Sequence, residues 1–239
     1  MRALPLIALF ALAGVAGAAA DTSPPEPLTI ADLRFEETSR GVEIRTADGR
    51  SQVTVERDRL SEASGLGIGG PVRFVIAAEA GRTECAGARR EGRCRFVSSP
   101  AYETGLAQRG VKLERRRDLL ALALVDARLA LVDELSRDGL APANSGHLVA
   151  AAALGVTGAW AHELKEAGLA IAEFDNLVVA RALKLDGSFI REMAAAGYPR
   201  LSARQAITMK AVGVTPAYAE AMNRVADAAQ AVERMGELQ

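Results

Sequence analysis

The apolar positions between residues 99 and 226 recur at an interval of 29 residues. The first column of this repeat is aromatic or leucine, the second, four residues later, is leucine or methionine, and the third is glycine. The columns are Tyr102, Leu131, Trp160, Phe189 and Tyr218; Leu106, Leu135, Leu164, Met193 and Met222; and Gly110, Gly139, Gly168 and Gly197. Positions four apart share a helix face, and glycine readily takes the left-handed conformation that ends a helix. Each repeat therefore predicts a first helix that buries its aromatic column and ends at the glycine.

A second helix is expected in the later repeats, starting at Asn144, Glu173 and Ser202. Ser202 and Gln205 have the spacing of a capping box, in which each side chain bonds the other's backbone. Gly155 and Gly213 end two of these helices, and Lys184 stands where the third glycine is expected. A helix-turn-helix unit this short cannot bury its apolar face alone, so the units must stack. The repeat therefore predicts a small α-solenoid.

The repeat departs from its pattern near both ends. No glycine occurs at residues 126–128, so residues 118–138 are expected to form one long or kinked helix. At the other end Ala226 replaces the terminal glycine, so the last helix is expected to continue to about Met235.

Before the repeat, short segments alternate apolar and polar residues, as strands with one buried face do. Val42 to Arg45 and Val72 to Ile76 are examples, and turn residues such as Asp48-Gly49 separate them. The glycine-rich loop at residues 65–70 is followed by Pro71 and a strand rather than by a helix, which argues against a phosphate-binding loop. The sequence therefore predicts an α+β fold, with a small antiparallel β-rich module at 28–98 followed by a helical repeat domain at 99–239.

The first twenty residues have the pattern of a secretory signal peptide. Arg2 precedes a short apolar run, and small residues follow at positions 16–20. Residues 21–27 read as a proline-rich linker, and no later apolar run approaches the roughly 20 residues that a spanning helix needs. We therefore expect an exported, periplasmic or secreted protein without stable membrane insertion after signal cleavage.

Cys85 and Cys94 flank a predicted hairpin turn. Because an exported protein meets an oxidising environment and neither histidine is nearby in sequence, a disulfide is favoured over a metal pair or a catalytic thiol. The net charge of -1 gives no electrostatic reason to expect nucleic acid as a partner.

The phrase GVTPAY at residues 213–218, its weaker copy GVTGAW at 155–160 and the Gly197-Tyr198 turn resemble a known bacterial repeat. It occurs in uncharacterised exported proteins and beside antirepressor-type membrane metallopeptidases similar to β-lactam sensors. The strand-turn-strand around Cys85 resembles the small β module that precedes the repeats in those proteins. The resemblance implies the architecture; the chain has no H-E-x-x-H motif, so it does not imply peptidase activity.

No nucleophile, paired-carboxylate, metal-ligand or cofactor motif is present, so we expect no catalytic residues, metal or cofactor. Two polar columns remain that core packing does not explain. They are Asp133, His162, Arg191 and Glu220 on the first helices, and His147, Asn176 and Gln205 on the second helices. The absence of nucleophile-base and metal-ligand spacings favours a non-catalytic protein- or peptide-binding or scaffold module of the cell envelope, and we expect one of the two columns to contact its partner. The alternative is an exported hydrolase or enzyme accessory whose site lies between the β module and the first repeat.

Overall fold

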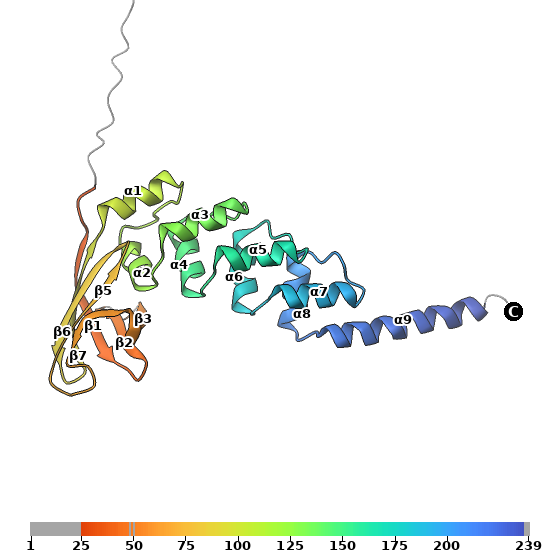
Figure 1. The fold of residues 1–239 in the computed structure, drawn as a ribbon, viewed down its shortest axis with the longest axis horizontal. Helices are drawn as coiled ribbons and strands as arrows, with labels where there is room; N and C mark the ends of the chain where they lie inside the picture. Colours follow the sequence, from red (N-terminus) through yellow and green to blue (C-terminus); the bar gives the residue numbers. More distant parts are fainter. Residues whose placement is uncertain (1–24, 48, 50, 237–239) are drawn as a thin grey trace, which may run out of the picture.

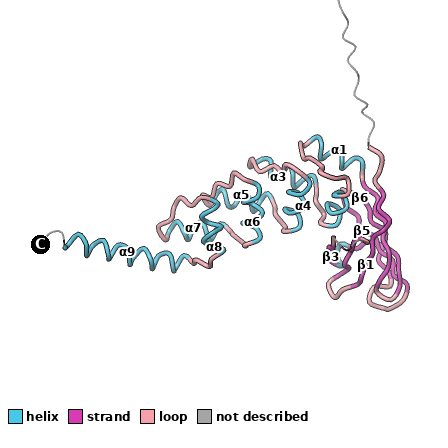
Figure 2. Tube along the Cα trace, turned by 180° about the vertical axis from the view of Figure 1, so that it is seen from behind, coloured by secondary structure: helices cyan, strands magenta, loops and turns pink. Residues whose placement is uncertain are grey.

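A computed structural model describes residues 25–47, 49 and 51–236 (Figure 1). The expected signal peptide at 1–20 and residues 21–24 of the expected linker lie outside the described residues. The molecule is elongated, with a β-sheet at one end and a row of helices that leads away from it to the C-terminus (Figure 2). The α+β class expected from the sequence is confirmed.

The sheet has seven antiparallel strands in the order β3-β2-β1-β7-β6-β5-β4. Their bounds are β1 Thr29–Glu37, β2 Gly41–Thr46, β3 Gln52–Glu56, β4 Leu60–Ser64, β5 Pro71–Ala78, β6 Gly81–Ala88 and β7 Glu91–Ser98. The edge strands β3 and β4 are consecutive in the chain, joined only by the short 3-10 helix η1, Arg57–Arg59. Because each residue spans at most ~3.6 Å, this link forces the sheet to curl until its two edges approach each other.

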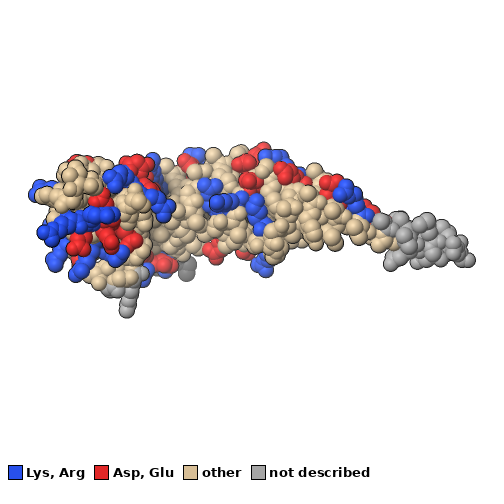
Figure 3. All heavy atoms as spheres, turned by 90° about the horizontal axis from the view of Figure 1, so that it is seen from below, with Lys and Arg blue, Asp and Glu red and all other residues tan. Residues whose placement is uncertain are grey.

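Alternation along the strands gives the curled sheet two different faces. One face is apolar and buried, with Leu33, Phe35 and Ile44 of β1 and β2 opposite Phe74 and Phe96 of β5 and β7. The other carries interleaved charges, visible at the sheet end in Figure 3. Arg45 there forms ion pairs with Glu43 and, at 3.0 Å, with Glu36. The period of two in the sequence therefore fixes which side of the sheet holds the core.

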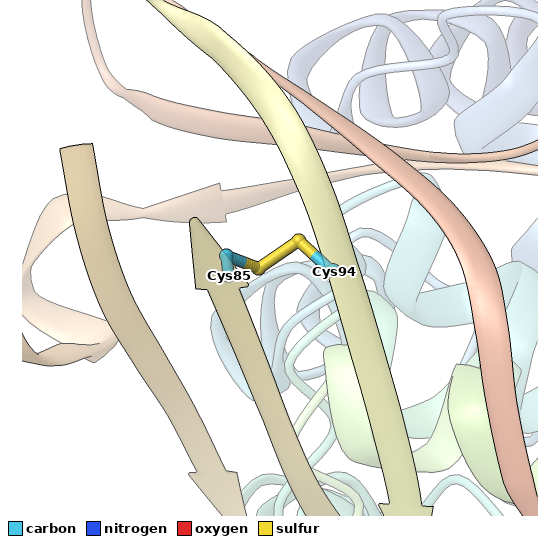
Figure 4. Close-up of a disulfide and its surroundings, with 2 residues drawn as sticks. All are labelled: Cys85 and Cys94. Atoms are coloured by element: carbon cyan, nitrogen blue, oxygen red, sulfur yellow. A yellow bond between two sulfur atoms is a disulfide. The ribbon is translucent and has the colours of Figure 1, made fainter. Parts of the chain in front are cut away.

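The disulfide is confirmed and joins neighbouring strands (Figure 4). Cys85 of β6 and Cys94 of β7 stand directly opposite each other in the register, with Cα atoms 4.1 Å apart. Both are buried, so the bridge belongs to the core of the sheet.

Nine helices follow among the described residues. Their bounds are α1 Pro100–Gln108, α2 Asp118–Leu124, α3 Leu129–Arg137, α4 Ser145–Ala153, α5 Gly158–Glu166, α6 Phe174–Ala182, α7 Gly187–Ala195, α8 Ala203–Ala211 and α9 Pro216–Gly236. The odd-numbered helices contact one another in sequence order, from α1 to α9, and so do the even-numbered ones from α2 to α8. Figure 1 shows these as two rows of helices. No helix in the described part of the chain is long and apolar enough to cross a membrane.

Side-chain caps fix the starts of several helices. Side-chain oxygens of Ser99, Asn144, Thr157 and Asp186 each accept the backbone N–H three residues on, and Ser202 forms the expected capping box with Gln205. The third column ends the odd-numbered helices, because Gly110, Gly139, Gly168 and Gly197 all have positive φ.

The single long or kinked helix expected over residues 118–138 is wrong. The chain forms two helices, α2 and α3, separated by Asp126 with φ of 55°. Asp126 occupies the same repeat column as Gly155, Lys184 and Gly213, all of which are left-handed. Aspartate tolerates this conformation better than most residues, and Glu79 of the β5–β6 turn accepts the N–H of Leu129 at 2.9 Å. Asp126 therefore takes the place of the expected glycine, and the left-handed turn between α2 and α3 is kept.

The hydrophobic core of the sheet continues into the first helices. Tyr102 and Leu106 of α1 and Leu119 and Leu122 of α2 belong to the same buried cluster as Phe74. A second cluster joins the later repeats, with Leu135, Leu164 and Met193 fully buried. Residues 98 and 99 therefore mark a change of secondary structure within a continuous core.

The expectation that Tyr218 is buried like its repeat equivalents is wrong. Its exposed fraction is 57%, compared with 9% for Trp160 and 6% for Phe189. α9 continues as one 21-residue helix, as expected, so no second helix folds back over Tyr218 within residues 25–236. Among the described residues, Tyr218 is followed by no second helix of the kind that covers Trp160 and Phe189.

Candidate functional site

The column on the first helices lies along α3, α5, α7 and α9. Its first member, Asp133, accepts two hydrogen bonds from Arg109 of α1, at 2.7 and 2.9 Å. The donated hydrogen bonds and positive charge of Arg109 hold the pKa of Asp133 below its usual range. Asp133 therefore already has a strong partner within the protein.

The other members of this column are exposed and more weakly paired. The His162 ring lies 3.4 Å from Asp138 and 3.9 Å from Glu166. Lys165 is the closer partner of Asp138, at 2.8 Å, and its hydrogen bond is the main reason that the pKa of Asp138 is lowered. Arg191 and Glu220 extend the column on α7 and α9. Their ion-pair distances, to Glu163 and Arg224, are 3.9 and 3.5 Å.

The column on the second helices has a structural role. His147, Asn176 and Gln205 each occupy the third position of their helix, α4, α6 and α8. Gln205 completes a capping box, Asn176 donates to the side chain of Glu173, and His147 accepts the N–H of Ala143 at 3.4 Å. These side chains therefore serve the starts of their own helices, which explains a polar column that core packing left unexplained.

His147 has a further contact that couples two repeats. Its ring stacks on Phe174 of α6, with centroids 4.7 Å apart and planes within 4° of parallel. Its Nε2 lies 3.5 Å from the carboxylate of Asp175. The half-buried ring thus ties α4 to α6 rather than facing solvent freely.

The sequence reasoning missed two cationic contacts, each between the first and the second helix of one repeat. The guanidinium of Arg181 on α6 lies 5.2 Å from the Trp160 ring, and the ammonium of Lys210 on α8 lies 4.7 Å from the Phe189 ring. Arg181 and Lys210 are themselves 29 residues apart. That spacing was a signal in the sequence, because a cation at a repeat position next to an aromatic column can pair with its face.

A cavity lies at the junction of the sheet and the first repeat, and the sequence did not indicate which residues line it. Its volume is about 340 Å³, and it lies between α2 and strands β1 to β3. Its apolar lining is Ile30, Leu33, Ile44, Val53, Leu120, Ala121 and Leu124. Volumes of this order are at the lower end for small-molecule sites. No single motif could have revealed it, since the lining comes from four elements far apart in the chain.

Polar groups line one side of this cavity: Thr46, Ser51, Arg115, Arg117 and Asp118. Asp118 is held by Arg115 at 3.2 Å and by the buried hydroxyl of Ser145 at 2.9 Å. The guanidinium of Arg117, by contrast, has no hydrogen-bond or ion-pair partner among residues 25–47, 49 and 51–236. The cavity therefore combines an apolar interior with one unengaged cation.

No catalytic constellation accompanies these features. Ser145 already donates to Asp118, and neither His147 nor His162 lines the cavity. Within the described residues, His, Cys, Asp and Glu form no cluster of three or more that could hold a metal ion. The chain matches no protein-family model, no curated protein and no solved structure at a significant level. Function must therefore be argued from the surfaces themselves.

Proposed function

We propose that this chain is a non-catalytic, exported binding or scaffold protein of the cell envelope. In this proposal the stacked helices act as an α-solenoid, and the column on the odd-numbered helices contacts a protein or peptide partner. The main observation in favour of this proposal is a row of exposed polar side chains on α5, α7 and α9, which pack against one another in that order. His162, Arg191 and Glu220 have side-chain exposures of 58, 58 and 60%.

The weak internal pairing of this row supports a binding role. Exposed ion pairs at 3.5–3.9 Å contribute at most about 1 kcal/mol, so a partner can replace them at little cost. The signs also alternate along the row, from Arg191 on α7 to Glu220 on α9. A matching partner would present an acidic group next to Arg191 and a basic group next to Glu220.

The column on the second helices is the weaker candidate. Its members are engaged in hydrogen bonds at their own helix starts, and releasing them to a partner would lose those bonds. The disulfide supports the export part of the proposal, since such bridges persist in oxidising compartments.

The test compares two triple variants in the mature chain. One carries His162→Ala, Arg191→Ala and Glu220→Ala, and the other carries His147→Ala, Asn176→Ala and Gln205→Ala. Crosslinking in envelope preparations followed by mass spectrometry should show partners lost only from the first variant. The second should keep the partners but unfold at lower urea concentration. If both variants retain the same crosslinked partners as the parent, the odd-helix row is not the binding surface.

The cavity favours one form of the alternative function. A ligand-binding accessory role fits its apolar lining and the Arg117 guanidinium, whereas a serine hydrolase is less well supported because neither Ser145 nor a histidine is among the lining residues. A small apolar fluorescent probe should bind the parent and lose binding in Ala121→Trp, which fills the cavity. Ala101→Trp, on the exposed side of α1, is the matched control. Equal probe binding by both variants would exclude this site.

A further inference from the structure

The last helix exposes an apolar stripe that the preceding repeat buries. Tyr218, Met222 and Val225 of α9 have exposed fractions of 57, 46 and 63%. Their equivalents one repeat earlier, Phe189, Met193 and Ala196, are only 6, 0 and 8% exposed. The same face of the repeat is thus buried on α7 and open to solvent on α9.

The earlier repeats show what kind of element covers this face. The second helix of the same repeat lies over it, as α6 does with Arg181 on Trp160 and α8 does with Lys210 on Phe189. The face therefore packs against a helix wherever the chain supplies one. Figure 1 shows that α9 extends straight past the last repeat with no helix beside its outer part.

The stripe on α9 has the spacing of a coiled-coil seam. Tyr218, Met222, Val225 and Ala229 follow one another at intervals of four, three and four residues. The stripe runs over residues 218–229, about 18 Å or nearly two heptads, within the 21-residue helix. The contact of α9 with α7 uses a different side, where Ala219 is buried and Asn223 donates to the carbonyl of Ala196.

The residues that flank the seam indicate the occupant. Along residues 218–229, Ala221 and Ala226 stand beside it, while the charged residues Glu220, Arg224 and Asp227 lie on the opposite side of the helix. Charges beside a seam normally select a different partner or exclude an identical one. Here two copies of the same helix can meet without placing like charges together, and the small flanking residues allow close approach.

We propose that α9 pairs with α9 of a second copy of this chain, forming a homodimer across the stripe of Tyr218, Met222, Val225 and Ala229. The pairing is isologous, so one surface supplies both halves of the interface. It leaves the sheet and the first repeats of each copy free. Through it, two of the proposed partner-binding rows would be carried by one particle.

Sedimentation equilibrium over a range of protein concentrations tests the pairing in the mature, disulfide-bonded chain. The parent should show a reversible monomer–dimer equilibrium. Met222→Glu combined with Val225→Glu should give the mass of a single chain at every concentration. Asp227→Lys, which changes a charge on the opposite side of the same helix, should dimerise like the parent. Circular dichroism and Trp160 fluorescence should be unchanged in both variants, because the substituted side chains are exposed in the monomer.

Two results would overturn the proposal. A parent chain that stays monomeric at the highest concentration would show that the stripe does not bind a second copy. A double glutamate variant that dimerises as strongly as the parent would place the interface elsewhere. Neither result depends on whether the column on the odd-numbered helices binds a partner. Sedimentation measures the mass of the purified chain, whereas that column is tested by crosslinking.

Discussion

The indole N–H of Trp160 donates a hydrogen bond of 2.9 Å to the backbone carbonyl of Leu185, the residue that follows the left-handed turn at Lys184. Two repeats earlier, Tyr102 donates its hydroxyl to the carbonyl of Ala127 at 2.6 Å, directly after the left-handed Asp126. Tyr102 and Trp160, which share a repeat column, thus make equivalent bonds to the turn that precedes the next odd-numbered helix. Burial of the Tyr102 hydroxyl, with the nearby carboxylates of Glu79 and Asp126, raises the pKa of its phenol.

The first prediction removes this bond. Trp160→Phe keeps an aromatic ring but leaves the buried carbonyl of Leu185 without its side-chain donor, so unfolding free energy should fall by about 1–3 kcal/mol. Part of the loss will come from the smaller ring. Urea titration followed by circular dichroism measures the change. Tyr218→Phe is the control, because Tyr218 is exposed and should lose well under about 0.5 kcal/mol.

The second prediction tests the register of the repeat. Phe189→Ala should cost ~3–5 kcal/mol, because the ring is 6% exposed and its removal leaves a cavity between α7 and α8. His162→Ala should cost well under about 1 kcal/mol, since the ring is exposed and its ion pairs are long. Equal urea midpoints for the two variants would show that the columns have been assigned to the wrong faces.

The third prediction concerns Lys184, which takes the left-handed conformation with φ of 53° where Gly155 and Gly213 stand in neighbouring repeats. A non-glycine residue there is strained by roughly 1–2 kcal/mol, partly offset by the greater freedom of glycine in the unfolded chain. Lys184→Gly should therefore raise the free energy of unfolding by up to about 1 kcal/mol. Lys210→Gly, within α8, should lower it by a similar amount. A destabilising effect of Lys184→Gly would mean that the lysine side chain makes contacts that outweigh the strain.

Features of the fold that depend on a few neighbouring residues could be predicted from the sequence, and features that depend on distant elements could not. Asn144 and Ser202 indicate helix starts and Gly110, Gly139 and Gly197 indicate helix ends, because caps and left-handed turns depend on a few neighbouring residues. Asp126 was misread because two residue types can occupy the same left-handed turn. The burial expected for Tyr218 is wrong because it depends on a second helix packed over the ring, which the described residues after Tyr218 do not form. The cavity beside Arg117 depends on the curl of the sheet, for which the sequence holds no short-range signal.

The fourth prediction concerns the disulfide. Replacing Cys85 and Cys94 by alanine should lower the free energy of unfolding by ~2.7 kcal/mol in the chain-entropy model for a loop of about ten residues. The strands should still pair, because β6 and β7 share eight cross-strand positions in unbroken register. Thermal unfolding of the double variant, compared with the parent under non-reducing conditions, measures the difference. Alkylation of both cysteines in the native parent without reductant would instead show that the bridge is absent in solution.

The fifth prediction is the acid sensitivity of the N-cap at Asp186. Hydrogen bonds from the Ser188 hydroxyl and the Phe189 backbone N–H hold the pKa of Asp186 below its usual range. A carboxyl whose pKa is lower when folded binds a proton more readily when unfolded. Its stabilising contribution is therefore complete above the unfolded pKa of about 3.9 and is lost as pH falls through the lower folded value.

Asp186→Asn separates this titration from the cap itself. Asparagine is a comparable N-cap but does not titrate, so the variant should be about as stable as the parent near neutral pH, within about 0.5 kcal/mol. Below about pH 4 its stability should fall less steeply than that of the parent, because one proton-linked loss has been removed. Urea titrations at a series of pH values measure both slopes. The slopes of the two proteins will differ only in part, since Asp133 and Asp138 also have lowered pKa values and titrate in both. Identical slopes would show that Asp186 is not stabilised in its charged form by the α7 terminus.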